Sequence, residues 1–438
     1  MHHFPYWWKF FKPYHLDNSN LSFYDLIVIG SGYAGISAAS EAVKQGMTVL
    51  VIDRAKLGEG ASTRSAGMVS GGLNLGKKIN LIEEFGIQKT KKFINESIES
   101  YNDLQSLIKG QENDLHFYKS GRLVLGHSNK KTFTLSKKTN FLNEHSELDI
   151  EMVSNLNEEL SSSYYKSGML VKDAASINPA LFYEFLLNKC LSLKCHFKTN
   201  CSLMNYKKNN QDYELHTTKG TLKTKYLIIA TNGYSDNAIG TEHNSIIGVP
   251  TYMCATGIIG EDHILKLMPK LRMYSDTKND LYYFRPSPDF KRIIFGGFPI
   301  WKSNLEKKSY IEKFFLQKIK LIFPNIQNFH IENIWSGKVG VTLNTLPKLE
   351  KQGMKISVYG CNGSGVALMP YLGKKSARLV IGKTNYKSVI EEISHKQTKF
   401  KKFIILFLPF LGFYYKFKEN SFIYYRRRQF NFCCRTYN

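Results

Sequence analysis

The sequence of 438 residues has few cysteines, no internal repeat and no hydrophobic run long enough to span a membrane. Its seven cysteines are scattered, odd in number and without CxxC or His-x-Cys spacing, which argues against a disulfide framework or a metal site. The N-terminus also lacks the basic-then-apolar pattern of a secretory leader. These absences predict a reducing, cytoplasmic compartment.

Acidic residues are scarce beside basic ones, 36 against 60, so the formal net charge is +24. Such a charge suits an anionic partner such as RNA or an acidic lipid surface. Only eleven of the basic residues are Arg, however, and the Lys residues are dispersed, which makes a nucleic-acid site the weaker interpretation. Basic clusters occur at 399–402 and 426–428, on either side of the apolar run 403–415. That run is shorter than the ~20 residues of a spanning helix, which leaves two alternatives: a terminal helix packed on the domain or a peripheral membrane anchor.

A dinucleotide-binding fingerprint lies near the N-terminus. Gly30, Gly32 and Gly35 follow the strand-like run 24–29, and Asp53 ends the next strand-like run. The first glycine permits a tight turn, the second lets the backbone approach a pyrophosphate, and the third allows the helix to pack closely on the strand. The helix that follows directs its positive end at the phosphates, and Asp53 suits a ribose diol rather than a 2′-phosphate.

The rest of the chain predicts an α/β protein with two domains. A strand-like run ends in Ala-Thr-x-Gly at 230–233, and another leads into a glycine-rich turn at 360–366. Residues 247–330 instead carry β-rich runs typical of an antiparallel sheet. We expect a Rossmann-like domain, discontinuous in sequence, and a second α+β substrate domain built on an antiparallel sheet. The expected ranges are 24–110, 151–240 and 331–385 for the first domain, 111–150 and 241–330 for the second, and 386–438 for a C-terminal helix and basic tail.

The order and spacing of these segments resemble the FAD-dependent oxidoreductases of the D-amino-acid oxidase and sarcosine oxidase superfamily. Within it, the γ-glutamylputrescine oxidoreductase-like branch is the most similar. The matching segments are YDLIVIGSGYAGISAA at 24–39, GEGASTRSAGMVSGG at 58–72, YLIIATNGY at 226–234, YYFRPSPDFKRIIFGG at 282–297, WSGKVGVTLNTLPKL at 335–349 and YGCNGSGVALMPYLGKKSARL at 359–379.

The resemblance implies non-covalent FAD as the cofactor. It assigns Asp53 to the adenosine ribose, residues 61–68 to the ribityl chain and flavin edge, and residues 363–366 to the pyrimidine end of the flavin. Backbone amides at that end would raise the flavin potential. The residues expected to bind the cofactor are Gly30, Gly32, Tyr33, Ala34, Gly35, Asp53, Arg54, Ala61, Ser62, Thr63, Arg64, Ser65, Ala66, Gly67, Met68, Ser202, Thr231, Gly233, Gly363, Ser364, Gly365 and Val366.

Three positions depart from the pattern of the superfamily. Amino-acid oxidases carry a carboxylate-clamping Arg just after the Trp-x-Gly motif, where this chain has Lys338, a point charge that is not equivalent to a bidentate Arg. Sarcosine oxidases link FAD to a Cys, for which the nearest match is Gly337. They also use a Lys for oxygen activation, at about the place of Ile294. The electron acceptor therefore stays open between oxygen and a quinone or protein.

Together these features predict that a small-molecule amine or N-substituted amino compound is oxidised at a C–N bond. A hydride would pass to flavin N5, and the imine would then hydrolyse. No acid–base side chain stands out, and the candidates for substrate contact are Arg285, Tyr283 and Lys338. Two alternatives stay open: an FAD-dependent tRNA-modifying enzyme, with Lys gathered at the flavin entrance, and a low-turnover flavin-binding sensor or assembly partner, without an open cavity.

Overall fold

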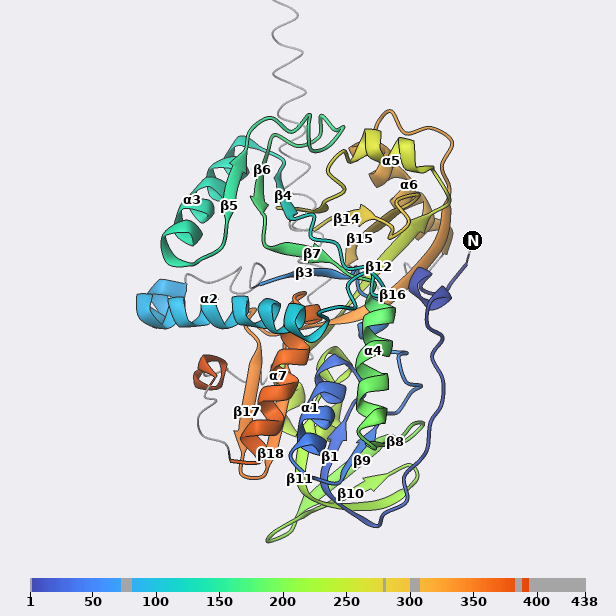
Figure 1. Ribbon diagram of the computed structural model, residues 1–438, viewed down its shortest axis with the longest axis vertical. Coiled ribbons are helices and arrows are strands. Elements are labelled where there is room, and N and C mark those ends of the chain that lie inside the picture. Colours follow the sequence, from blue (N-terminus) through green and yellow to red (C-terminus); the bar gives the residue numbers. More distant parts are fainter. Residues whose placement is uncertain (1, 72–80, 279–280, 300–307, 383–387, 394–438) are drawn as a thin grey trace, which may run out of the picture.

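The computed structural model describes residues 2–71, 81–278, 281–299, 308–382 and 388–393, which form two large sheets with helices around them (Figure 1). The apolar run 403–415, both C-terminal basic clusters and most of the expected tail lie outside the described residues. The helices are α1 (Tyr33–Lys44), α2 (Leu81–Leu107), α3 (Asn129–His145), α4 (Pro179–Ser192), α5 (Glu261–Leu267), α6 (Lys308–Ile322) and α7 (Gly365–Val380), with short 3₁₀ helices η1 (Tyr6–Lys9), η2 (Ala61–Thr63), η3 (Asn232–Tyr234), η4 (Asn237–Ile239), η5 (Thr241–Ser245) and η7 (Val389–Glu392). The strands are β1 (Phe23–Ile29), β2 (Val49–Ile52), β3 (Met68–Ser70), β4 (Arg122–Gly126), β5 (Ile150–Val153), β6 (Ser167–Val171), β7 (Ala174–Ser176), β8 (His196–Lys198), β9 (Leu203–Lys208), β10 (Tyr213–Thr217), β11 (Gly220–Ile229), β12 (Ile247–Thr256), β13 (Met273–Asp276), β14 (Tyr283–Pro286), β15 (Ile293–Pro299), β16 (Ile331–Val341), β17 (Lys348–Gln352) and β18 (Lys355–Tyr359).

The first sheet has the predicted Rossmann-like form. Its parallel strands run in the order β18-β11-β1-β2-β8, with β17 antiparallel at one edge and the β9–β10 hairpin joined to β11. Helices α1, α4 and α7 stand side by side over one face (Figure 1). The strands β2 and β18 are buried along their whole length, as parallel strands covered on both faces should be. The sequence prediction of an α/β fold with a Rossmann-like part is confirmed.

The second sheet runs in the order β16-β12-β15-β14-β13-β4-β6-β5 and is antiparallel except for the β4–β13 pair. Two of its strands, β6 and β16, and all of β5 except Ile150 lie in ranges that we expected to belong to the first domain. These strands belong to the second sheet because β6 forms an antiparallel ladder with β4, and β16 forms a long antiparallel ladder with β12. The alternation of residues in a strand shows that one face is buried but does not show which sheet the strand joins.

Alternation gives the second sheet two different faces. Tyr274, Phe284 and Phe295 are cross-strand neighbours on β13, β14 and β15, and their rings stack with centroids 5.1 and 5.7 Å apart. Phe323, just after α6, meets the same stack. The adjacent residues, Ser275, Tyr283 and Gly296, are also cross-strand neighbours and point to the opposite face.

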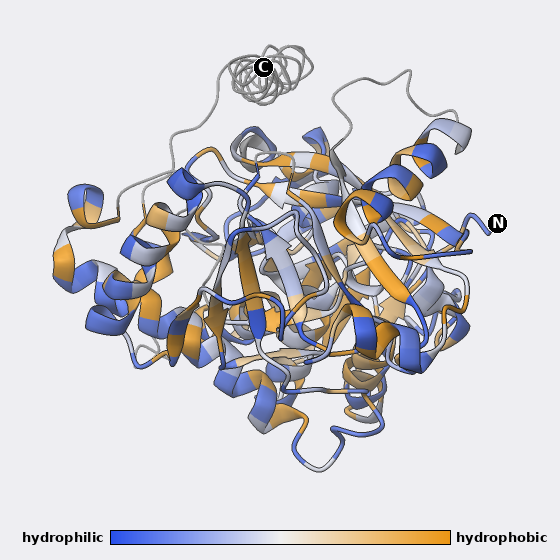
Figure 2. Ribbon diagram, turned by 90° about the horizontal axis from the view of Figure 1, so that it is seen from above, coloured by the Kyte–Doolittle hydropathy of each residue, from blue (hydrophilic) through white to orange (hydrophobic). Residues whose placement is uncertain are grey.

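Hydrophobic residues mark the strands at the centre of the molecule, whereas hydrophilic residues mark many outer turns of the helices (Figure 2). Within the described ranges, no helix combines the length and the apolar composition needed to cross a membrane.

The aromatic stack is expected to be a main source of stability for the second sheet. Phe284→Ala should lower the free energy of unfolding by about 3–5 kcal/mol, because it empties the fully buried centre of the stack. Phe133→Ala is the matched control: this ring is 61% exposed on α3, so its loss should cost less than about 0.5 kcal/mol. Urea unfolding followed by circular dichroism measures both, and equal losses would contradict the expectation.

Candidate functional site

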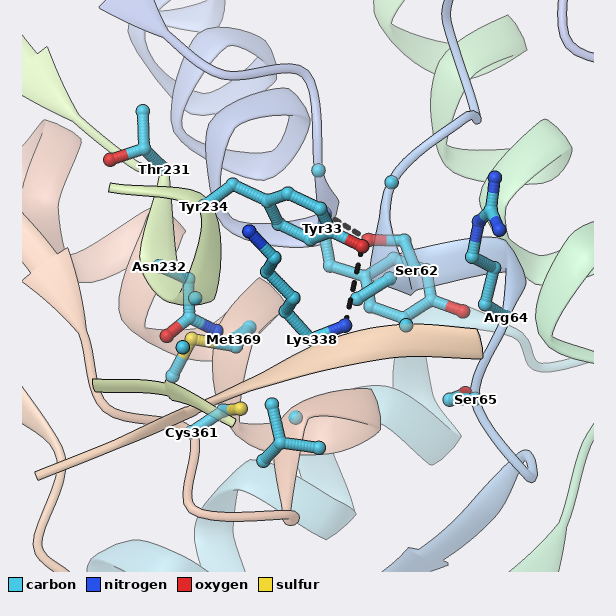
Figure 3. A pocket seen from close by; sticks show the side chains of 18 of the residues that line it. Tyr33, Ser62, Arg64, Ser65, Thr231, Asn232, Tyr234, Lys338, Cys361 and Met369 are labelled. Carbon is cyan, nitrogen blue, oxygen red and sulfur yellow. Dashed lines mark hydrogen bonds between the residues drawn. The ribbon is translucent and has the colours of Figure 1, made fainter. Parts of the chain in front are cut away.

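The described residues surround a cavity of about 1390 Å³ between the carboxyl ends of the parallel strands and the inner face of the second sheet. Its volume exceeds the roughly 300–1,000 Å³ of most small-molecule sites, so an extended ligand and a second, smaller one fit together. Segments far apart in the sequence line it: the start of α1, the loop 58–68, η3, β16 and the start of α7 (Figure 3).

The fingerprint glycines act in different ways. Gly30 has φ near +101°, and a Cβ there would lie 2.9 Å from the carbonyl oxygen of Ala230. A Cβ on Gly35 would lie 1.8 Å from the carbonyl oxygen of Gly30, so Gly35 is needed for α1 to approach β1. Gly35 itself does not line the cavity. Gly32 differs because it has an ordinary φ of −73°, lines the cavity, and a Cβ there would meet only the Ser62 hydroxyl, at 3.3 Å.

Asp53 is held firmly at the end of β2. Its Oδ2 accepts hydrogen bonds from the Ser31 backbone N–H and hydroxyl, at 2.8 and 2.7 Å, and its Oδ1 accepts one from the Ala55 N–H at 2.9 Å. The carboxylate lines the cavity while held this way, which suits a ligand with hydroxyl donors. Arg54 beside it pairs with Asp236 at 2.9 Å and donates to the Tyr234 carbonyl, closing one edge of the cavity.

The loop 58–68 ties the two halves of the cavity together. The Ser62 hydroxyl accepts a hydrogen bond from the Tyr33 N–H at 3.1 Å, as Figure 3 shows. Arg64 points away from the first sheet: it donates to the Ser336 carbonyl of β16 at 3.0 Å and lies over the Trp8 ring. Burial lowers the pKa of the Arg64 guanidinium.

Thr63 does not line the cavity. Its hydroxyl is fully buried, donates to the Gly58 carbonyl at 2.5 Å and accepts from the Trp8 indole N–H at 2.9 Å. Thr63 therefore stabilises the loop 58–68 through these two hydrogen bonds without facing the cavity. Every other residue predicted to bind the cofactor, apart from Gly35, lines the cavity, including Ser202, Thr231, Gly233 and the turn 363–366.

The third glycine-rich turn opens α7 onto the cavity. Gly363, Ser364, Gly365 and Val366 all line it at the helix N-terminus, where backbone N–H groups are left without helical partners. Sequence reasoning missed Asn232, which takes a left-handed φ of +45° and accepts a hydrogen bond from the Gly360 N–H at 3.1 Å. This bond joins the ends of β11 and β18. Asn adopts the left-handed conformation more readily than most residues, so an Asn directly after a strand end could have indicated this turn.

Of the three predicted substrate contacts, two line the cavity. Tyr283 lies across Gly296, where a Cβ would come within 2.1–2.6 Å of the ring, so the glycine makes room for the tyrosine. Burial raises the pKa of Tyr283 to about 12. Lys338 is exposed on β16, and its Nζ lies 5.8 Å from the centre of the Tyr234 ring (Figure 3).

Arg285 is placed differently from the prediction. It is 2% exposed, lies beneath the Trp7 ring and donates to the Ile177 carbonyl at 3.0 Å, and it is not among the residues that line the cavity. Ile177 in turn donates to the Gly67 carbonyl at 2.8 Å. Arg285 shares a face of β14 with Tyr283, but the N-terminal segment covers it. We therefore assign Arg285 to support of the loop 58–68.

Arg122 and Ser70 also line the cavity and were not predicted as site residues. Arg122 begins the apolar strand β4, which lies in the range 111–150 that we expected to belong to the second domain. The sequence did carry a signal for Arg122: charged residues are rarely buried, and this one is the first residue of an otherwise apolar strand.

The site fits the FAD that the sequence implies. A Cβ at position 32 would crowd only the Ser62 hydroxyl, so glycine there leaves the backbone open to a group in the cavity. A held carboxylate and two helix N-termini face the same cavity, and these are the donors and acceptors that suit a ribose, a pyrophosphate and an electron-rich ring. Asp53, Gly32 and the 363–366 turn would hold these three parts in that order.

Comparison with known proteins agrees with this geometry. The family model described as FAD dependent oxidoreductase matches residues 25–379. The chain is 24% identical to the probable oxidoreductase OrdL of Haemophilus influenzae, over 87% of this chain and 90% of that protein. It is 23% identical to the gamma-glutamylputrescine oxidoreductase of Escherichia coli, over 82% and 84% of the two chains.

Solved structures share the fold. Glycine oxidase from Geobacillus kaustophilus aligns with a TM-score of 0.70 at 16% identity, over 86% of this chain and 97% of that one. L-proline dehydrogenase from P. horikoshii aligns with a TM-score of 0.66 at 17% identity, over 82% and 93%. With the family model covering most of its length, this chain belongs to the FAD-dependent oxidoreductases.

Proposed function

We propose that this enzyme oxidises a C–N bond of an amine or N-substituted amino compound, with FAD held non-covalently. The observation that carries the proposal is the continuation of the cavity from the FAD residues onto the inner face of the second sheet. Relatives in sequence and in structure bear the names gamma-glutamylputrescine oxidoreductase, glycine oxidase and L-proline dehydrogenase, all of which refer to amino compounds.

The part of the cavity over the second sheet, which we call its substrate half, has a lining that favours an amine as the substrate. Among the described residues that the second sheet contributes to it, Arg122 and Lys338 are cationic, and none is Asp, Glu or His. Positive charges close to a bound amine lower the pKa of that amine and so favour its neutral, oxidisable form. Orientation against Tyr283 and Met253 then does more for the reaction than an acid–base residue would.

Bound FAD supplies the two-electron acceptance that the oxidation needs. The protein positions the substrate carbon and keeps the amine unprotonated, and water then hydrolyses the resulting imine to a carbonyl compound and an amine.

The two alternatives receive less support. Lys338 is the single lysine among the described residues that line the cavity, so the basic charge of the chain is not gathered at this entrance as a tRNA-modifying enzyme would require. The cavity also continues from the FAD residues onto the second sheet, which favours turnover over a sensor role.

Non-covalent FAD is the first expectation. Gly337 has no side chain to form a link, and the Cys361 thiol, which also lines the cavity, lies 3.7 Å from the Gly340 carbonyl oxygen. Acid precipitation should release the flavin into the supernatant. Yellow colour retained in the pellet would contradict this, and its loss in Cys361→Ser would identify the bonded residue.

Asp53→Ala is expected to weaken FAD binding by about 1–3 kcal/mol, because the ribose hydroxyls lose their acceptor. Asp25→Ala is a matched control: Asp25 accepts from the Thr48 N–H and hydroxyl at 2.8 and 2.7 Å, much as Asp53 does from Ser31, but it lies at the other end of β1. Flavin fluorescence titration of both variants measures the difference. Equal FAD affinities in the two variants would refute the assignment.

Anaerobic flavin bleaching tests the proposed reaction. Primary or secondary amines with a distal polar group should reduce the flavin, whereas glycine and D-alanine should do so slowly, because Lys338 stands where the carboxylate-clamping Arg would be. The rate should rise as pH increases and the substrate amine loses its proton. Since the pKa of Tyr283 is about 12, Tyr283→Phe should leave the midpoint of that profile unchanged. Bleaching by D-alanine as fast as by the best amine would overturn the proposal.

A further inference from the structure

The N-terminal segment, residues 2–20, joins the two sheets along one side of the molecule. In Figure 1 it is the dark blue chain that runs from the end marked N to the start of β1. At its beginning, the backbone of His2 pairs with β16 of the second sheet through hydrogen bonds of 2.6 and 2.9 Å. Further along, Asp17 forms a bridge with Lys198 of β8 in the first sheet. The helix η1 lies between these two attachments and contacts the loop 58–68.

One residue of the loop 58–68 faces this segment instead of the cavity. All residues of the loop line the cavity except Thr63, which is fully buried. The indole N–H of Trp8 in η1 donates to the Thr63 hydroxyl at 2.9 Å, and that hydroxyl donates to the Gly58 carbonyl at 2.5 Å. The Arg64 guanidinium lies over the Trp8 ring, with its Cζ 4.7 Å from the ring centre. Trp8 therefore holds the loop from the side opposite the cavity.

The preceding tryptophan supports the other end of the loop through Arg285. Trp7 is fully buried, and its ring centre lies 5.2 Å from the Arg285 Cζ. Arg285 donates to the Ile177 carbonyl at 3.0 Å, and the Ile177 N–H donates to the Gly67 carbonyl at 2.8 Å. A Cβ on Gly67 would lie 2.0 Å from the same Ile177 carbonyl oxygen, so the contact is close. Two consecutive tryptophans thus support the loop at Thr63 and, through two intermediate residues, at Gly67.

The stretch between these two supported points is the part of the loop that we expect to face the flavin. Arg64, Ser65 and Ala66 lie between Thr63 and Gly67, and all three line the cavity. A loop that is ordered before its ligand arrives loses less conformational entropy on binding, so contacts behind it raise the affinity for the ligand in front of it. The contacts of η1 are of this kind.

We propose that the N-terminal segment positions the flavin-facing loop, and that FAD affinity depends on the hydrogen bond between Trp8 and Thr63. Trp8 does not line the cavity, so it is a positioning residue that acts through Thr63 without touching the cofactor. The inference concerns the cofactor and is independent of the amine that the enzyme oxidises.

Release of FAD on dilution of the FAD-bound enzyme, followed by the rise of flavin fluorescence, tests this. Trp8→Phe keeps a ring beneath Arg64 but removes the N–H, and it should raise the Kd for FAD about 3- to 10-fold, as expected for one hydrogen bond. Thr63→Val should raise the Kd at least as much, because the bond to Gly58 is lost as well, whereas Thr63→Ser keeps the hydroxyl and should resemble wild type. The double variant of Trp8→Phe and Thr63→Val should match Thr63→Val alone, since both changes remove the same bond.

Tyr6→Phe is the matched control within η1. The buried Tyr6 hydroxyl accepts a hydrogen bond from Lys9 of the same helix at 2.7 Å, and its ring lies near Arg292, away from the loop. Its loss should leave the Kd for FAD unchanged. Hydrogen exchange of the FAD-bound enzyme should be faster at residues 61–67 in Trp8→Phe but not in Tyr6→Phe.

An unchanged Kd in Trp8→Phe would overturn the inference, and so would an equal rise in Tyr6→Phe, which would identify the loss as general destabilisation. A double variant whose loss of affinity is the product of the two single losses would also contradict it, because Trp8 and Thr63 would then act independently.

Discussion

The contact between Gly35 and the carbonyl of Gly30 sets the geometry on which the cofactor half of the cavity depends. With no Cβ at Gly35, α1 starts directly over the end of β1, and its first residues, Tyr33 and Ala34, line the cavity. The same strand end lies against Ala230, which follows β11, so the ends of two parallel strands and one helix meet at a single point. Asp53 and the turn before α7 lie around that point because parallel strands end on the same edge of a sheet.

The second sheet supplies the other half of the cavity through simple alternation. On β13, β14 and β15 successive residues point to opposite faces of the sheet, so Phe284 packs in the aromatic core while the adjacent Tyr283 lines the cavity. A shift of one residue in register would bury Tyr283 and place phenylalanine in the cavity. The stacked rings therefore hold the register that places Tyr283 in the lining of the cavity.

Charge is distributed unevenly between the surface and the cavity. The chain carries a large excess of Lys, yet three of the four basic residues that line the described cavity are Arg: Arg54, Arg64 and Arg122. Two of them serve the framework, since Arg54 pairs with Asp236 and Arg64 bridges to β16. Arg122 is held at the wall of the cavity by hydrogen bonds to the Ser275 and Ser70 hydroxyls.

The sequence by itself determined most of the first half of the cavity, the part lined by the residues that it predicts to bind FAD. The glycine spacing, Asp53 and the turn 363–366 impose local backbone and donor requirements that hold in any context, and all of these residues except Gly35 line the cavity. The substrate half depended on long-range pairing. Only the tertiary structure showed that the N-terminal segment covers Arg285, that Thr63 faces Trp8, and that β5, β6 and β16 join the second sheet. Arg122 reaches the cavity because β4 pairs with β13, about 150 residues further along the chain, and no local pattern encodes that pairing.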